Sequence, residues 1–268
     1  MHGLIIFIVC AILLAILLFI KIPGLKRKIK LPSNFRNLLL QNVYYYRKLN
    51  KADKIRFEEK IKDFLSYIKI HGVKTEVTDL DKLLVASSAV IPVFGFPEWR
   101  YYNLHDVLLY PDTFDRDNFS ITDLDRNTLG MVGTGPLQRM MILSKPALRE
   151  GFMNEGGKHN TGIHEFAHLL DKADGSTDGI PRQLLNEKST SRWISLMNKT
   201  MEEIKRGYSD IDAYAATGST EFFPVVAEYF FQRPDLFKEN HPELFELMEE
   251  IFQQQVTMHD KPNGVSNS

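Results

Sequence analysis

Two histidines four residues apart, His164 and His168, flank a glutamate in the stretch NTGIHEFAHLLDKADG, residues 160–175. Residues four apart in a helix lie one turn apart on the same face, so both imidazoles can face one metal ion. Zinc binds neutral imidazole nitrogen at about 2.0–2.1 Å. Glu165 is about 100° around the helix from His164, which places it beside such an ion. The H-E-x-x-H spacing therefore predicts a zinc site with Glu165 as the base for water.

A catalytic zinc site also needs a third protein ligand and an open fourth position. The metzincin pattern would continue with glycine and histidine, but here Asp171 and Asp174 follow, which disfavours that class. The segment 212–231 supplies two glutamates, Glu221 and Glu228, seven residues apart and hence on one helical face. Large apolar residues surround them, and a buried carboxylate needs a partner such as a metal. The spacing alone leaves open which glutamate is the ligand.

Two other interpretations compete with a catalytic zinc site. The stretch can be a core helix whose histidines have structural partners. A structural zinc would want four protein ligands, and the one cysteine, Cys10, lies near the N-terminus, far from this stretch. Asp171 and Glu228 are candidates for orienting the imidazoles of the ligands. His159, just before the helix, is interpreted as a loop histidine.

The elements around these motifs predict an α+β fold, mostly helical with a small β-sheet. Periodic apolar residues and helix-ending signals indicate helices from about residue 35, and then at 51–72, 79–95, 161–172, 187–206, 220–232 and 243–255. Short apolar runs indicate strands at 105–114 and 138–148, and a glycine-rich loop at 130–136 precedes the second. The part at 139–144 is a candidate edge for pairing with an extended peptide.

The N-terminus differs from the rest of the chain. Residues 4–20 are apolar without interruption, and as a helix they would span roughly 25 Å, close to the thickness of a bilayer core. No basic residue precedes this run and five follow it, which disfavours a cleaved signal peptide. The pattern predicts a single-pass, membrane-anchored protein with its catalytic domain in the cytoplasm.

The predicted organisation is an anchor at 1–22, a basic linker at 23–34, one zinc peptidase domain at 35–256 and a disordered tail at 257–268. Charged residues make up 25% of the chain and the formal net charge is −1, so no direct binding to nucleic acid is expected.

The motifs HEFAHLLD, DGSTDGIP and YAATGSTEFFPVVAEYFF resemble the Mlc titration factor A family of zinc metallopeptidases. The last motif is also similar to the catalytic domain of anthrax lethal factor. In both, a tyrosine precedes the glutamate ligand by seven residues, as Tyr214 precedes Glu221 here. The resemblance covers roughly residues 35–255, and implies a zincin-like fold. The apolar segment at 4–20 is extra, and Pro224 and Ala227 replace an expected alanine and serine.

The resemblance implies one Zn²⁺ per chain, held by His164, His168 and Glu221, with Glu165 and Tyr214 as catalytic residues. It implies a gluzincin-type peptidase, aminopeptidase-like, that hydrolyses peptide substrates with a zinc-activated water. The alternative function is a zinc-containing regulatory protein that binds and sequesters a transcriptional repressor, because the family takes its name from such an interaction. The expected partners are therefore a peptide substrate, the membrane and a transcriptional regulator.

Overall fold

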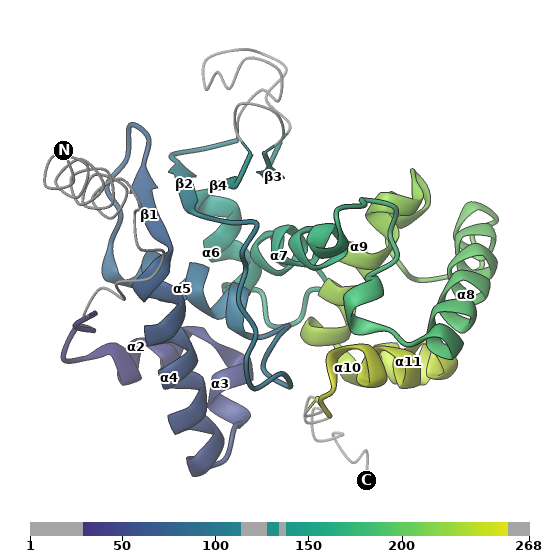
Figure 1. The fold of residues 1–268 in the computed structure, drawn as a ribbon, viewed down its shortest axis with the longest axis horizontal. Coiled ribbons are helices and arrows are strands. Elements are labelled where there is room, and N and C mark those ends of the chain that lie inside the picture. Colours follow the sequence, from purple (N-terminus) through teal and green to yellow (C-terminus); the bar gives the residue numbers. More distant parts are fainter. Residues whose placement is uncertain (1–28, 114–127, 134–137, 257–268) are drawn as a thin grey trace, which may run out of the picture.

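The computed structural model describes residues 29–113, 128–133 and 138–256, which form helices around one small sheet (Figure 1). This arrangement confirms the predicted α+β class with mostly helical content. The predicted anchor at 1–22, most of the basic linker and the predicted tail at 257–268 lie outside the described residues.

Among the described residues, no helix combines the length and the apolar content that crossing a membrane requires. This finding contradicts the membrane-anchored location predicted from the sequence, and that prediction is withdrawn. The segment on which it rested, residues 4–20, lies outside the part of the chain that the structure describes.

The sheet has four strands in the order β1-β2-β4-β3. Strands β1 (Lys69–Gly72), β2 (Asp106–Tyr110) and β4 (Met140–Ser144) run parallel, and β3 (Gly130–Val132) runs antiparallel to β4. The prediction that 139–144 is a sheet edge was wrong, because β4 lies between β2 and β3. The short strand β3, inside the segment predicted to be a glycine-rich loop, forms that edge instead.

The N-terminal helices pack beside the sheet. They are α2 (Phe35–Asn42), α3 (Tyr44–Lys48), α4 (Lys51–Tyr67) and α5 (Asp79–Val90). Asn50 caps α4, and a capping box between Thr78 and Asp81 begins α5. Helix α4 ends at Tyr67 because Ile68 is extended, so the end of the helix predicted at 51–72 is strand β1.

The C-terminal half is helical throughout. It contains α6 (Lys145–Met153), α7 (Thr161–Asp171), η2 (Lys172–Asp174), η3 (Arg182–Leu184), α8 (Glu187–Lys205), η4 (Ala213–Ala216), α9 (Ser219–Gln232), α10 (Pro234–Asn240) and α11 (Pro242–Phe252). Ser144 ends β4 and caps α6, with a proline in the first helical turn. The strand predicted at 138–148 is therefore wrong in its second half.

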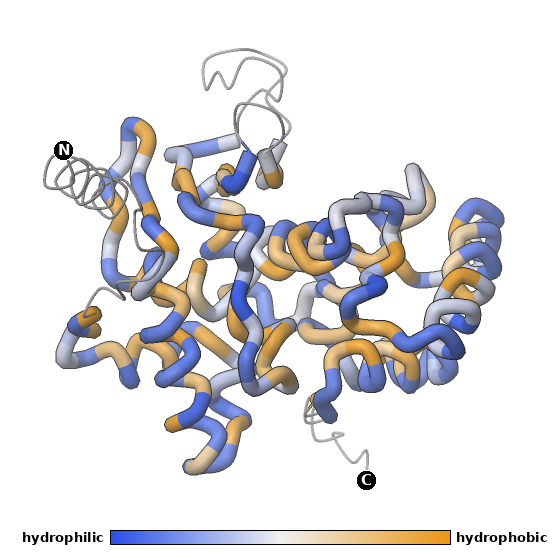
Figure 2. Tube along the Cα trace, in the orientation of Figure 1, coloured by the Kyte–Doolittle hydropathy of each residue, from blue (hydrophilic) through white to orange (hydrophobic). Residues whose placement is uncertain are grey.

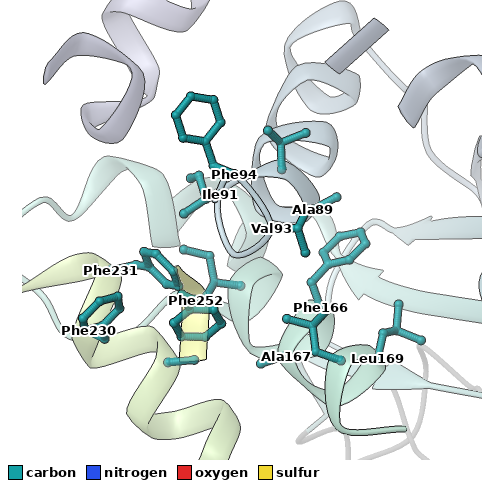
Figure 3. Close-up of a cluster of buried hydrophobic side chains, with 14 of the residues drawn as sticks. Ala89, Ile91, Val93, Phe94, Phe166, Ala167, Leu169, Phe230, Phe231 and Phe252 are labelled. Atoms are coloured by element: carbon teal, nitrogen blue, oxygen red, sulfur yellow. The ribbon is translucent and has the colours of Figure 1, made fainter. Parts of the chain in front are cut away.

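Aromatic side chains fill the core beneath α7 and α9. Figure 3 shows Phe166 of α7, Phe230 and Phe231 of α9, and Phe252 of α11 within one buried cluster. Figure 2 shows hydrophobic residues on the central helices, whereas α8 carries more hydrophilic ones. Phe166, Phe230 and Phe252 are fully buried. Burial of such rings on one side of α7 and α9 holds both helices in fixed positions.

Candidate metal centre

Helix α7 lies at the centre of the molecule and carries the H-E-x-x-H motif (Figure 1). Asn160 caps its N-terminus by accepting a hydrogen bond of 3.1 Å from the backbone N–H of Ile163. Gly162 lets α7 approach α5 closely, because a Cβ atom there would lie 2.1 Å from the Ser88 hydroxyl. The other face of α7 packs against α9. The motif therefore sits on a helix that is fixed from both sides.

The two imidazoles of α7 point at the same place. Nε2 of His164 and Nε2 of His168 are 3.2 Å apart. Oε2 of Glu221 lies 3.3 Å from the first nitrogen and 3.2 Å from the second. The structure thus brings together the three residues that the family resemblance implied as ligands, and they form a group able to hold a metal ion.

The spacing of these three atoms fits a tetrahedral ion. With bonds of about 2.0 Å, tetrahedral geometry separates two ligand atoms by about 3.3 Å. Oε2 of Glu221 is also buried without a hydrogen-bond partner among the described residues. A buried carboxylate oxygen without a partner is costly, and a cation between the three atoms would satisfy it.

Glu228, which the sequence offered as a candidate for orienting an imidazole, contacts the ring nitrogen of His164 that faces away from Glu221 and His168. Its Oε1 lies 2.6 Å from Nδ1 of His164, and its Oε2 accepts a hydrogen bond of 2.6 Å from the backbone N–H of Asn160. When Nδ1 donates its proton to this carboxylate, the lone pair of Nε2 faces Glu221 and His168. Glu228 therefore orients the first imidazole and also ties α9 to the start of α7.

Protons compete for the same atoms in the metal-free protein. Burial opposes protonation of His164, but the carboxylates of Glu228 and Glu221 outweigh it and raise its pKa to about 10. Burial likewise opposes ionisation of Glu221, but the two imidazoles outweigh it and hold the pKa of this carboxyl below its usual range. The pocket therefore favours a positive charge between these groups.

Glu165 lies against the edge strand of the sheet. Its side chain is buried, and a Cβ atom placed on Gly130 would lie 2.6 Å from its Cγ and 2.7 Å from its Oε1. Burial raises the pKa of Glu165, although the two neighbouring imidazoles act in the opposite direction. A carboxylate with a raised pKa accepts a proton more readily near neutral pH.

Tyr214 lies on η4, across from α7. Its ring centroid is 6.1 Å from that of His164, and the side chain is about half exposed. Asp212 fixes the backbone here by accepting a hydrogen bond of 2.8 Å from the N–H of Tyr214. The predicted catalytic tyrosine is therefore close to the histidines and faces the same cleft.

All five predicted site residues line one cleft of about 630 Å³. Strand β3, helix α7, the short 3-10 helix η4 and helix α9 form its walls. The described lining residues outside the predicted set include Leu129, Gly130, Val132, His159, Lys172, Asp212 and Thr220. A larger cavity of about 730 Å³ lies elsewhere, beside α6, and holds none of the predicted site residues.

Asp171 was the second residue predicted to orient an imidazole of the ligands, but its side chain bonds to the backbone of a loop instead. Its Oδ2 accepts a hydrogen bond of 3.0 Å from the backbone N–H of Gly179, and its Oδ1 is buried without a hydrogen-bond partner in the described residues. Gly179 in turn lies directly against Ser219, at the start of α9. Asp171 therefore holds the loop between α7 and α8, which lies against the start of α9, rather than an imidazole.

Sequence patterns missed several residues of the cleft. His159 lies in the loop before α7, as predicted, but it also lines the cleft, with Nε2 3.5 Å from Oδ2 of Asp212. Gly130 was part of a predicted loop. A glycine in a strand often marks a place where the backbone closely approaches another group, here the side chain of Glu165. Lys172 carried no signal at all, because its place in the cleft depends on where β3 lies.

Paired histidines on one helix, an intervening glutamate and a glutamate on a second helix beside an edge strand define a metallopeptidase type of centre. A sequence profile described as Glucose-regulated metallo-peptidase M90 matches residues 24–253. The chain belongs to this family, which agrees with the resemblance found in its motifs.

Curated relatives support the same assignment. The chain is 30% identical to Mlc titration factor A of Escherichia fergusonii, over 70% of this chain and 75% of that protein. It is 29% identical to Mlc titration factor A of Klebsiella pneumoniae, over 72% and 75%. It is 26% identical to an uncharacterized protein of Synechocystis, slr2042, over 83% and 84%.

Proposed function

We propose that this protein is a zinc-dependent peptidase of the H-E-x-x-H type. The observation that carries the proposal is the convergence of Nε2 of His164, Nε2 of His168 and Oε2 of Glu221 within 3.3 Å of one another. These three residues would hold one Zn²⁺. When bound, zinc supplies Lewis acidity, which polarises a carbonyl and makes water nucleophilic near neutral pH.

Glu165 is the proposed general base. Its carboxylate accepts a proton from the attacking water and then returns it to the nitrogen of the leaving amine. Burial against β3 supports this role, since a desolvated carboxylate with a raised pKa is a better proton acceptor than an exposed one.

Tyr214 is the proposed donor to the oxyanion. A phenol hydroxyl beside the metal centre can donate a hydrogen bond to the negative charge that develops on the carbonyl oxygen. Its position across the cleft from His164, on a backbone fixed by Asp212, supports the role.

Among the described strands β3 is an edge of the sheet, and its backbone is the proposed partner of the substrate. Gly133 donates to the carbonyl of Met140, and Ser144 donates to the carbonyl of Leu129, so alternate residues of the edge face β4. The main-chain groups of Gly130 and Val132 therefore face away from β4. An extended peptide can pair with these groups independently of its side chains.

The test uses the full chain and two charge-removing variants. We expect the wild type to bind about one zinc and to cleave peptides. Glu165→Gln should keep the zinc and lose cleavage, while Glu221→Gln should lose both. Zinc content by mass spectrometry or atomic absorption and hydrolysis of a broad peptide panel provide the two measurements. Full hydrolysis by Glu165→Gln, or a wild type without zinc, would refute the mechanism.

The finer proposal from the family resemblance is aminopeptidase-like action. An enzyme that requires a free α-amino group should not cleave a peptide after its N-terminus is acetylated. Matched free and acetylated peptides with the same scissile bond therefore test this property separately from the chemistry.

A second candidate function is the binding of a regulatory protein, which the name Mlc titration factor A of the relatives favours. Such binding has no need of the base Glu165. Capture of a regulator by Glu165→Gln with wild-type affinity, combined with no peptide hydrolysis by the wild type, would favour this second function over the first.

A further inference from the structure

Asp210 is not among the described residues that line the cleft, yet its carboxylate contacts four side chains at hydrogen-bond distance. Its Oδ2 accepts from Nζ of Lys158 at 2.7 Å, from the hydroxyl of Tyr229 at 2.6 Å and from Nδ2 of Asn240 at 2.8 Å. Its Oδ1 lies 2.7 Å from Nε2 of His241. One carboxylate therefore joins the segment before α7, helix α9 and the junction between α10 and α11 to the loop that precedes η4.

Three of these joined segments also form the metal centre. Lys158 lies two residues before the cap of α7, and Tyr229 directly follows Glu228 on α9. Asp210 itself lies four residues before Tyr214 of η4. The contacts of Asp210 therefore hold the tyrosine at a set distance from the two helices that carry the proposed metal ligands.

The backbone between Asp210 and Tyr214 is held in place by its own contacts. Ile211 is buried, and Ala215 is buried and donates a hydrogen bond of 3.0 Å to the carbonyl oxygen of Asp212. The side chain of Asp212 accepts a hydrogen bond of 2.8 Å from the N–H of Tyr214. The tyrosine ring is about half exposed, so its position depends strongly on this backbone. A shift at Asp210 is therefore passed on to the ring.

The negative charge of Asp210 is what holds its partners. Burial opposes its ionisation, but the bonds from Lys158, Tyr229 and His241 outweigh burial and hold the pKa of this carboxyl below its usual range. Hydrogen bonds to an ionised acceptor are roughly twice as strong as neutral ones. An amide of the same size has only one oxygen that accepts, so it cannot serve partners on both sides of the carboxyl group.

We propose that Asp210 is a positioning residue for the reaction, which holds Tyr214 at the metal centre where the phenol hydroxyl meets the developing oxyanion. The proposal rests on the proposed peptidase function and adds to it a residue outside the cleft that acts through another. Because the hydroxyl acts in the transition state, loss of this positioning lowers kcat and leaves KM and zinc content nearly unchanged.

The experiment measures kcat, KM and zinc affinity for the zinc-loaded full chain with Asp210→Asn, alone and combined with Tyr214→Phe. The matched control is Glu58→Gln. Glu58 is also a buried carboxylate that binds a basic side chain, that of Arg36, and the hydroxyl of Tyr46, and it is not among the described lining residues. Urea unfolding of each variant reports the loss of stability.

We expect kcat of Asp210→Asn to fall roughly 5- to 30-fold, because even a shift of about 1 Å in a catalytic group lowers the rate about 100-fold. In the Tyr214→Phe background the same substitution should change kcat less than about twofold, because the hydroxyl through which it acts is already absent. Glu58→Gln should lose stability and keep kcat. Wild-type kcat in Asp210→Asn, an equal loss in both backgrounds, or a loss explained by weaker zinc binding would overturn the proposal while the peptidase function stands.

Hydrogen exchange separates the positioning from the chemistry. Exchange of the backbone amides in residues 210–217 is followed by mass spectrometry in the wild type, Asp210→Asn and Glu58→Gln. We expect faster exchange there only in Asp210→Asn, because the N–H groups of Tyr214, Ala215 and Thr217 all bond within this segment. If the wild type cleaves no peptide but exchange rises in this way, the positioning stands and the peptidase function falls. Unchanged exchange in Asp210→Asn would overturn the positioning.

Discussion

Gly130 and Glu165 are in contact, and the contact leaves no room for a side chain at position 130. A Cβ atom there would lie 2.6 Å from Cγ and 2.7 Å from Oε1 of Glu165. The edge strand β3, whose backbone is proposed to bind substrate, is therefore also the surface against which the proposed base is packed. The close approach excludes water from one side of the carboxylate and limits its possible orientations.

This contact predicts the effect of Gly130→Ala. The added methyl group must displace either the carboxylate or the strand, and a shift of about 1 Å in a catalytic group can lower the rate about 100-fold. We expect kcat to fall roughly 10- to 100-fold, with zinc content unchanged because no proposed ligand is touched. The measurement is kcat and zinc content on the same preparation.

Gly156→Ala is the matched control, because a Cβ atom there has its nearest neighbour at 3.9 Å. It should behave as the wild type does. Wild-type kcat in Gly130→Ala would show that the orientation of Glu165 does not depend on this contact.

The position of Tyr214 in the cleft predicts that removal of its hydroxyl group slows the chemical step. Tyr214→Phe keeps the ring and removes the hydroxyl, so we expect kcat to fall about 10- to 100-fold while KM and zinc content change little. Tyr208→Phe serves as control, since Tyr208 is 80% exposed and does not line the cleft. An equal loss in both variants would argue against a role for the Tyr214 hydroxyl.

The bond between Glu228 and His164 predicts an effect on metal affinity. Glu228→Gln keeps the size of the side chain and its possible bond to the N–H of Asn160, but removes the charge that holds the imidazole. Changes to such outer partners typically lower metal affinity about 10- to 100-fold. Zinc titration against a competing chelator measures the change. Glu246→Gln, on the exposed face of α11, should leave affinity unaltered.

Asp171 predicts a pH-dependent change in stability. Burial raises its pKa from 3.8 to about 6, so the folded protein binds this proton more tightly than the unfolded chain does. The stability linked to this proton is full below pH 3.8 and is lost as the pH rises through 6. We expect metal-free Asp171→Asn to gain stability over the wild type between pH 4 and 7, by on the order of 2 kcal/mol.

Urea unfolding of the two metal-free proteins at several pH values measures this difference in free energy of unfolding. A difference that is constant from pH 4 to 7 would show that Asp171 does not titrate with a raised pKa. Asn keeps an oxygen that can accept the hydrogen bond from Gly179, so the loop between α7 and α8 stays anchored.

Local sequence signals predicted the helices well and the strands less well. Helices α7, α8 and α9 begin within one residue of their predicted starts, because a cap or a clear apolar period marks each of them. Strands β1 and β3 were missed. Both are only a few residues long and have exposed or half-buried side chains, so neither shows an apolar run. Their extended conformation comes from pairing with β2 and β4.

The sequence by itself determined that His164 and His168 share one face of a helix, since that follows from the helical repeat. It also indicated that the helix with Glu221 and Glu228 is buried. The helical spacing left open which glutamate is the ligand, and the family resemblance implied Glu221. The tertiary structure brings Oε2 of Glu221 within 3.3 Å of both imidazoles and places Glu228 against Nδ1 of His164. The same is true of Gly130 and Lys172, which enter the cleft through the position of β3. The rotation and shift of α9 and β3 against α7 depend on aromatic packing between segments far apart in the chain, and no local spacing encodes them.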